Sequence, residues 1–382
     1  MLIERNIVTR IRKTIAGAPR VVILYGPRQA GKTTLLRELF KPAPERVVFF
    51  NGDDFRTQDL LGQPNLRALK TAVGSHRIVC IDEAQRIPNI GLSLKLLFDA
   101  LKLRIIASGS SSLELSSQVH EPLTGRATIF QLYPVALGEL TATLPDTSMT
   151  PQLETFLRFG MYPKVLTTDG EDEKQQYLND LVNTYLYKDI LMFEQVRKPR
   201  KVIDLLSLLA LQIGAQVSIT ELGKRLALSR PVVEKYLDIL EKMFVIVNVR
   251  GFSRNLRSEI YKTSKYFFMD LGVRNALIHN FNPLNLRSDC GALFENFCII
   301  ERIKAVSNAG AFANFHFWRT YEQKEIDFIE ERRGTLAGYE CKWSERKHAG
   351  TAFKTFAAAY PRSVLRVVRP NNLALLTTVD GT

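Results

Sequence analysis

Residues 26–33 read GPRQAGKT, a spacing of glycine, lysine and threonine that suits the binding of a triphosphate. Glycines at both ends of such a loop let the backbone turn tightly and point its N–H groups at phosphate oxygens. We expect Lys32 to reach the β- and γ-phosphates and Thr33 to ligate Mg²⁺. The expected binding residues are Gly26, Pro27, Arg28, Gln29, Ala30, Gly31, Lys32, Thr33 and Thr34.

The segments on either side of this loop have the patterns that it requires. Residues 21–25 form an apolar run, which predicts a buried strand, and residues 34–40 have the spacing of an amphipathic helix. The N-terminus of that helix would add its positive end to the loop. The sequence therefore predicts a site for ATP and Mg²⁺ between a strand and a helix.

A pair of acids ends a second apolar run, HRIVCIDEAQ at residues 76–85. We expect Asp82 to hold the Mg²⁺ through water. Glu83 is placed to polarise the water that attacks the γ-phosphate. Acids at the end of a strand are common, but after a phosphate-binding loop this pair indicates a catalytic role.

Two further candidates follow. The run LRIIASGSSS at residues 103–112 predicts another buried strand. If that strand lies between the first two, Ser108 or Ser110 comes near the γ-phosphate. Arg126, in LTGR, precedes a fifth strand and could stabilise transition-state charge in the site of a neighbouring subunit, which would require a homo-oligomer. The alternative is an ordinary surface arginine.

Taken together, GPRQAGKTTLL, CIDEAQRIPN, IIASGSSSLEL and LTGR resemble the AAA+ ATPases that occur in many bacterial and archaeal genomes as two-part proteins. In that family a conserved domain of unknown function follows the ATPase core. The resemblance implies an ATP-binding parallel sheet, with Arg28 and Gln29 as part of the family's loop signature. It does not imply a cellular role.

The middle of the chain begins with a boundary at residues 141–152, TATLPDTSMTPQ. Beyond it, FLRFGMYPKVL resembles the family's glycine-proline turn, here Gly160 and Pro163. Related ATPases use such a turn to close over the nucleotide base. The family usually has glycine where this chain has Met161. Residues 175–196 have helical apolar spacing and are expected to form part of a helical lid.

Residues 217–241 predict two amphipathic helices joined by a short turn. Two apolar runs follow, at 245–249 and 261–270, with a basic segment between them. This order predicts a helix-turn-helix with a wing. The basic residues of the expected wing are Arg250, Arg254 and Arg257.

The winged helix has two interpretations. It could contact DNA through its second helix and the basic wing. Alternatively, it could mediate contacts between domains only. Glu234 and Asp238 on the second helix argue against strong phosphate binding.

The last part of the chain contains a second group of candidate residues. A hairpin with its loop at 332–335 would place Asp327 directly opposite Glu340, with Cβ atoms about 5 Å apart. Two facing carboxylates require a cation, and a divalent metal held by oxygens is one answer. Lys342 would share the face of Glu340, because residues two apart on a strand point the same way. Glu295 lies on an amphipathic helix upstream.

The order Glu295, Asp327, Glu340 and Lys342 resembles the restriction-endonuclease-like nuclease fold. The resemblance implies that the three acids bind Mg²⁺ and that the lysine, which is not a ligand, orients water or stabilises charge at phosphorus. A metal-dependent nuclease and a non-cleaving remnant that binds nucleic acid remain as alternatives.

Composition limits the partners and the compartment. The 382 residues are 46% hydrophobic and carry a net charge of +13, which favours an anionic partner, with nucleic acid ahead of anionic lipid. The four cysteines show no C-x-x-C spacing, which is typical of reduced thiols. No signal peptide or membrane helix is apparent, so we expect a cytoplasmic protein with no membrane partner.

The expected fold class is α/β, with an AAA+ parallel sheet followed by smaller domains. Three functions fit: an ATPase that acts on or is regulated by DNA, a protein-remodelling ATPase whose C-terminal domain binds a protein, and an ATP-gated metal-dependent nuclease. The expected domains are the ATPase core at 1–145, a helical lid at 146–205, a winged helix at 206–280 and a restriction-endonuclease-like domain at 285–382.

Overall fold

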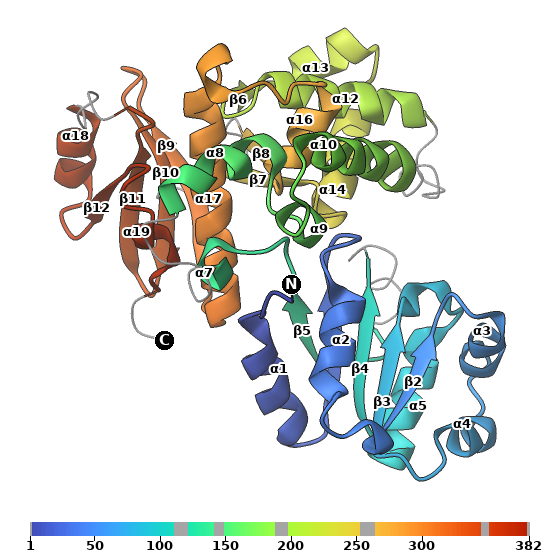
Figure 1. Ribbon diagram of the computed structural model, residues 1–382. Helices are drawn as coiled ribbons and strands as arrows, with labels where there is room; N and C mark the ends of the chain where they lie inside the picture. The colour runs from blue at the N-terminus through green and yellow to red at the C-terminus, as the bar shows by residue number, and fades with distance from the viewer. Residues whose placement is uncertain are drawn as a thin grey trace. The chain divides into compact units, whose positions relative to one another are not determined.

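The computed structural model describes residues 2–110, 121–140, 149–187, 198–252, 264–344 and 351–379. The chain divides into two compact units, drawn in Figure 1. No helix in the described ranges combines the length and the apolar character needed to cross a bilayer. The N-terminal unit comprises Glu4–Pro134 and Lys242–Phe244, and the C-terminal unit comprises Met1–Ile3, Val135–Glu241 and Val245–Thr382.

The N-terminal unit is built on a five-stranded sheet in the order β2-β3-β4-β1-β5, and all of its strand pairs are parallel. Its central strands read as continuous apolar runs because helices bury both faces of such a sheet. The prediction that the strand ending in Ser108 lies between the other two is confirmed. The strands are β1 (Val21–Tyr25), β2 (Val47–Asn51), β3 (Ile78–Asp82), β4 (Arg104–Gly109) and β5 (Ala127–Gln131).

Two helices cover one face of this sheet. Ile7 and Ile11 of the first helix pack with Leu36 of the second against Val22 and Leu24, which alternate on one face of β1. The segment at 34–40 is helical, as predicted. The helices of this unit are α1 (Ile7–Ala16), α2 (Lys32–Phe40), α3 (Phe55–Gly62), α4 (Leu66–Val73) and α5 (Ile90–Leu101), with 3₁₀ turns η1 (Pro44–Arg46) and η2 (Ala84–Arg86).

The C-terminal unit begins with a group of helices. The helical prediction for 175–196 is confirmed as far as residue 187, and residues 188–197 lie outside the described ranges. Their action as a lid stays a prediction. The elements are α7 (Leu137–Leu140), α8 (Met149–Phe159), α9 (Pro163–Leu166), α10 (Glu171–Asp180), a π-helical turn η4 (Leu181–Leu186) and α12 (Pro199–Leu211).

The turn at Gly160 contacts Asp270 of the same unit. Gly160 has φ +74°, and a Cβ there would lie 2.1 Å from a carboxylate oxygen of Asp270. The other Asp270 oxygen accepts the N–H of Met161 at 2.7 Å. Burial raises the pKa of Asp270. Glycine is therefore required here for contact with Asp270, and closure over a nucleotide base stays a prediction.

Two helices and three short strands follow α12. The strand β8 pairs antiparallel with both β6 and β7. The two predicted helices are confirmed. Arg250 is exposed at the end of β7, whereas Arg254 and Arg257 lie outside the described residues. The elements are β6 (Gln216–Val217), α13 (Ile219–Leu226), α14 (Arg230–Lys242), β7 (Ile246–Gly251) and β8 (Ser264–Phe268).

The end of the chain has the order helix, three strands, helix, strand. The strands β9, β10 and β11 run antiparallel, and β12 is parallel to β11. Figure 1 shows α17 running beside these strands and α18 on their far side. The elements are α16 (Leu271–Leu277), the 3₁₀ turn η5 (Leu284–Leu286), α17 (Cys290–Ala309), β9 (Asn314–Arg319), β10 (Glu325–Arg332), β11 (Thr335–Cys341), α18 (Thr351–Ala359), β12 (Val364–Val368) and α19 (Ala374–Thr377).

One sheet extends across the C-terminal unit. Its order is β12-β11-β10-β9-β7-β8-β6, because β7 pairs with β9 through Arg250–His316 and Gly251–Phe317. The sheet thus crosses the boundary expected between 280 and 285.

Candidate nucleotide-binding site

The loop between β1 and α2 has the backbone that a phosphate-binding loop needs. A Cβ on Gly26 would lie 2.1 Å from the carbonyl oxygen of Leu132, so only glycine fits beside the end of β5. Gly31, the residue before α2, has φ +97°, and Gln29 has φ +61°. These left-handed residues turn the chain sharply into the helix.

Lys32 is held inside the loop. Its side chain is buried, and Nζ donates to the carbonyl oxygens of Gly26 at 2.9 Å and Pro27 at 3.0 Å. Thr34 is the exposed third residue of α2. A buried ammonium within such a loop favours a nearby anion, because a buried charge is stabilised by an opposite charge.

Thr33 and Asp82 lie side by side although they are far apart in sequence. The Thr33 hydroxyl donates to Oδ2 of Asp82 at 2.6 Å. A hydroxyl and a carboxylate are the hard oxygen donors that Mg²⁺ prefers. The pair therefore fits the predicted Mg²⁺ of an ATP complex.

Hydrogen bonds connect Asp82 and Glu83 to the two predicted serines. The hydroxyl of Ser108 donates to Oδ1 of Asp82, and the Glu83 N–H donates to the Ser108 oxygen at 3.3 Å. The Gln85 amide donates to Glu83 at 2.6 Å and to the hydroxyl of Ser110 at 3.0 Å. The structure thus brings both acids and both serines together at the ends of β3 and β4.

Two residues of this cluster were missed in the sequence. Gln85 fixes the Glu83 carboxylate, and its position two residues after the acid was the available signal. Gly52 lies at the end of β2, where a Cβ would stand 2.2 Å from the carbonyl oxygen of Glu83. Glu83 itself has φ +50°, so its backbone is held in an uncommon conformation at the site.

Arg5 was also missed. Its guanidinium donates to the carbonyl oxygen of Ala30 at 2.9 Å and to that of Tyr133 at 2.6 Å. It thereby joins the phosphate-binding loop to the segment after β5. Because 128 residues separate Arg5 from Tyr133, no local pattern identifies this contact.

Arg126 is bound within its own subunit. Its Nε and Nη2 donate to the two carboxylate oxygens of Asp99, on α5, at 2.9 and 3.1 Å. These bonds raise the pKa of Arg126 and lower the pKa of Asp99. Both side chains remain about a third exposed, at 34% and 38%. The predicted action in a neighbouring subunit stays a prediction.

The strand order, the loop and the adjoining acids define an AAA-type P-loop ATPase fold. Residues 18–141 match the family described as an AAA domain. Residues 150–284 and 290–378 match two domains of unknown function, DUF8612 and DUF4143. These findings support the interpretation as an AAA+ ATPase with a DUF4143 region at its C-terminal end.

Relatives are similar along most of the chain. The uncharacterized protein Rv2008c of Mycobacterium tuberculosis is 28% identical over 376 residues, which cover 97% of this chain and 81% of the relative. An uncharacterized protein of Haemophilus influenzae is 22% identical over 331 residues, covering 82% and 80%. Among solved structures, the Walker-type ATPase paby2304 of Pyrococcus abyssi is similar in fold, with 16% identity, a TM-score of 0.50 and coverage of 72% of this chain and 96% of that one.

The C-terminal carboxylates lie on the predicted elements, with a corrected turn. The register is as expected, since Glu331 pairs with Leu336, but Arg332 also pairs with Thr335. The turn is therefore Arg333–Gly334, and both residues have positive φ. The ladder ends at the pair Phe328–Tyr339, one pair short of Asp327 and Glu340. Asp327 instead accepts the N–H of Cys341 at 2.6 Å.

Lysines pair with two of these acids, Glu295 and Glu340. Lys265 of β8, which is 3% exposed, bonds Glu295 at 2.9 Å and Glu325 at 2.5 Å. Lys342 forms an ion pair with Glu340. Burial raises the pKa of Asp327, and the nearby charges of Glu295 and Glu340 raise it further. Glu295, Asp327 and Glu340 are therefore close enough for their charges to influence one another.

The metal site expected at Glu295, Asp327 and Glu340 stays a prediction. Within the described ranges, no group of three or more His, Cys, Asp and Glu side chains is arranged to hold an ion. Lys265 was missed in the sequence, and it supplies positive charge beside Glu295.

Proposed function

We propose that this protein is an AAA+ ATPase that binds and hydrolyses ATP with Mg²⁺ and acts on, or is regulated by, DNA. The bonded array of Thr33, Asp82 and Ser108 carries the ATPase half of the proposal. It joins the helix after the phosphate-binding loop to the ends of two strands, where the terminal phosphate of a nucleotide would lie.

Each side chain has a task in this mechanism. Lys32 would exchange its backbone carbonyl partners for phosphate oxygens, whose negative charge an ammonium binds more strongly than a neutral carbonyl. Thr33 and Asp82 would hold Mg²⁺, which when bound neutralises charge on the phosphates. Glu83 would orient the attacking water and take up its proton, while Gln85 keeps the carboxylate directed towards Ser110.

The DNA half of the proposal is supported by charge and by the order of elements. The segment from α12 to β8 has the order helix, strand, helix, helix, strand, strand, which is that of a winged helix. The net charge of +13 favours a polyanion. Glu234, which argued against phosphate binding, is paired with Arg230 at 2.8 Å, so it adds less negative potential than expected.

The ATPase rate with and without DNA tests this proposal. We expect single- or double-stranded DNA to bind at low salt, with affinity that falls steeply as salt rises, and to change the rate. An ATPase rate that does not change when DNA is added, together with no DNA binding at low salt, would contradict the proposal. That outcome would favour the remodelling ATPase whose C-terminal unit binds a protein partner.

The C-terminal order of helix, three strands, helix and strand favours a second role. It supports a restriction-endonuclease-like fold for the region that begins at α17. Because Lys265 and Lys342 neutralise Glu295 and Glu340, we propose that this region binds nucleic acid without cleaving it. Plasmid DNA incubated with Mg²⁺ or Mn²⁺ should stay intact. If the wild type nicks the plasmid and Asp327→Ala does not, this role is contradicted and the alternative of a metal-dependent nuclease is favoured.

A further inference from the structure

A basic pocket lies in the N-terminal unit at the edge of the sheet opposite the nucleotide site. Its volume is about 640 Å³, and its walls come from α1, the end of α2, η1 and the starts of β3 and β4. Parallel strands all begin at one edge and end at the other. The loop after β1 and the acids after β3 stand at the strand ends, so the pocket at the strand starts is separate from them.

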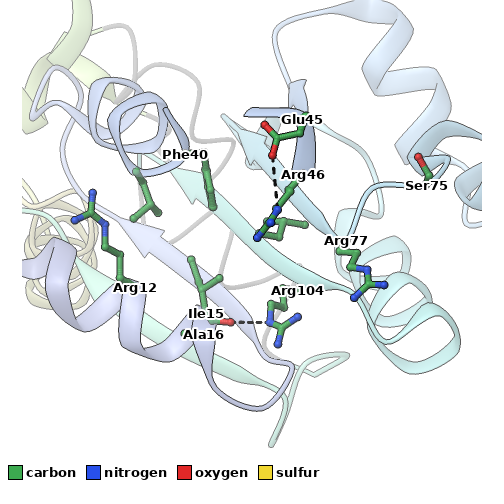
Figure 2. Close-up of a pocket in the computed structure, with 11 residues that line it drawn as sticks. Arg12, Ile15, Ala16, Phe40, Glu45, Arg46, Ser75, Arg77 and Arg104 are labelled. Atoms are coloured by element: carbon green, nitrogen blue, oxygen red, sulfur yellow. Dashed lines mark hydrogen bonds and ion pairs between the residues drawn. The ribbon is translucent and has the colours of Figure 1, made fainter. Parts of the chain in front are cut away.

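Positive charge dominates this pocket. Its charged residues are Arg12, Arg46, Arg77, Arg104 and a single acid, Glu45. Figure 2 shows the arginines spread across the pocket, from Arg12 on one side to Arg77 on the other. Several guanidinium groups with one carboxylate leave a surplus of charge that suits an anion with more than one phosphate.

The arginines differ in how firmly they are held. Arg104 donates from Nε to the carbonyl oxygen of Ile15 at 2.7 Å, so it is fixed in the wall. Arg46 lies 3.6 Å from Glu45, and both side chains are mostly exposed, at 75% and 69%. Such an exposed pair is weak. In the part of the chain that the structure describes, the exposed Arg12 and Arg77 side chains have no hydrogen-bond or ion-pair partner.

The floor between the arginines is apolar. Ile15, Leu39, Phe40 and Ile78 line it. Apolar and aromatic surface within a basic groove is the combination that proteins use for single-stranded nucleic acid, with phosphates on the arginines and bases against the apolar part. A small inorganic anion would use the charge and leave the apolar floor without a partner.

We propose that this pocket binds the phosphodiester backbone of a nucleic-acid strand. The inference rests on the proposed action on DNA and assigns it a surface in the ATPase unit itself. Three elements have one end in the pocket and the other at the nucleotide site. The helix α2 runs from Lys32 to Phe40, β3 runs from Ile78 to Asp82, and β4 begins at Arg104 and contains Ser108. Strand binding therefore has a direct path to the ATP site.

A pair of charge-reversal variants tests the proposal. Arg46→Glu combined with Arg77→Glu should weaken binding of a fluorescent single-stranded oligonucleotide by about tenfold or more at low salt, and should reduce the salt slope by about 2. Arg56→Glu combined with Arg67→Glu makes the same change in net charge at exposed positions on α3 and α4 and serves as the control. Thermal unfolding and ATP binding should match the wild type in both variants.

The outcomes separate this inference from the proposed function. If both variants lose affinity equally, or neither does, the pocket is not the site, although DNA binding and the ATPase proposal stand. If the wild type binds no single-stranded oligonucleotide at low salt, the inference fails, and if it binds no double-stranded DNA either, the proposed action on DNA fails with it. If tripolyphosphate or polyglutamate displaces the oligonucleotide from the wild type as well as unlabelled oligonucleotide does, the pocket takes any anion and the assignment to a nucleic-acid strand is wrong.

Discussion

At the scale of single residues, close backbone approach explains several side-chain identities at the site. Gly26 faces the carbonyl of Leu132 and Gly52 faces that of Glu83, so any Cβ at either position must displace a strand end. Both glycines place the backbone where it supports the loop or the acids. These glycines shape the site, and they take no direct part in the reaction.

Gly26→Ala should therefore impair nucleotide binding. The new Cβ would meet Leu132 O at 2.1 Å and push the loop away from β5. We expect ATP affinity to fall by at least tenfold, measured by calorimetry. Gly291→Ala is the matched control, because a Cβ there meets nothing within 4 Å. Unchanged affinity in Gly26→Ala would show that the loop tolerates the displacement.

Asp289 gives a pH-dependent prediction. Burial alone would raise the pKa of Asp289, but hydrogen bonds from Arg287 and Arg274 outweigh burial and lower it to about 2. An acid with a lowered folded pKa stabilises the protein above its unfolded pKa and loses that contribution as the pH falls through the folded value. The wild type should exceed Asp289→Asn in unfolding free energy by about 2 kcal/mol near neutral pH.

This advantage of the wild type should shrink as the pH falls from about 4 towards 2. Urea unfolding of both proteins across that range measures it. A gap that stays constant with pH would mean that the ion pairs of Asp289 do not set its pKa.

At the scale of elements, one buried ion pair holds α17 to the C-terminal strands. Arg302 of α17 bonds Glu330 of β10 at 2.5 Å and also donates to the carbonyl oxygen of Thr378. Both side chains are almost fully buried, at 1% and 3% exposure. Removing one partner of such a pair leaves an uncompensated charge in the core.

Glu330→Ala should accordingly destabilise the protein by about 3–5 kcal/mol. Glu331→Ala, one residue on and 40% exposed, should change stability by less than about 1 kcal/mol. Chemical unfolding of the two variants provides the comparison. Equal effects would indicate that the buried pair adds nothing beyond an exposed one.

Local patterns predicted much of this architecture. The strands β1, β3 and β4 are visible in the sequence because each is a short apolar run that leads into polar or glycine residues, at Gly26, Asp82 and Ser108. The C-terminal hairpin register followed from the expected position of its loop. The turn is shorter than expected, because Arg333 and Gly334 both have positive φ, and the pairing stops before Asp327 and Glu340.

Contacts between distant segments could not be predicted. Arg5 and Lys265 act across 128 and 30 residues, on partners that no periodicity identifies. Lys265 changes the interpretation of the C-terminal site, since it pairs with Glu295, one of the acids that the resemblance assigns to a metal. The pairing of β7 with β9 likewise joins two strands that are far apart in the sequence, and no local pattern in either strand identifies its partner.

At the scale of the whole molecule, the proposal of a homo-oligomer depends on the role of Arg126. If Arg126 acts in a neighbouring site, Arg126→Ala should lose ATPase activity whereas Asp99→Ala, which removes only its partner within the subunit, should keep it. Mixing Arg126→Ala with Lys32→Ala should then restore part of the activity, because a composite site with both residues can form. Equal losses in Arg126→Ala and Asp99→Ala, with no recovery on mixing, would reduce Arg126 to an intramolecular ion pair.

The central claim is that one site in the N-terminal unit binds ATP through Lys32 and hydrolyses it through Glu83. The most direct test measures ATP binding and steady-state turnover, with Mg²⁺, in the wild type, Lys32→Ala and Glu83→Gln. We predict that Lys32→Ala loses affinity, since it removes the cation in the loop. Glu83→Gln should bind ATP like the wild type and turn over at least about a hundredfold more slowly, because it keeps the shape of the acid and removes its base. Turnover by Glu83→Gln at the rate of the wild type would contradict the account.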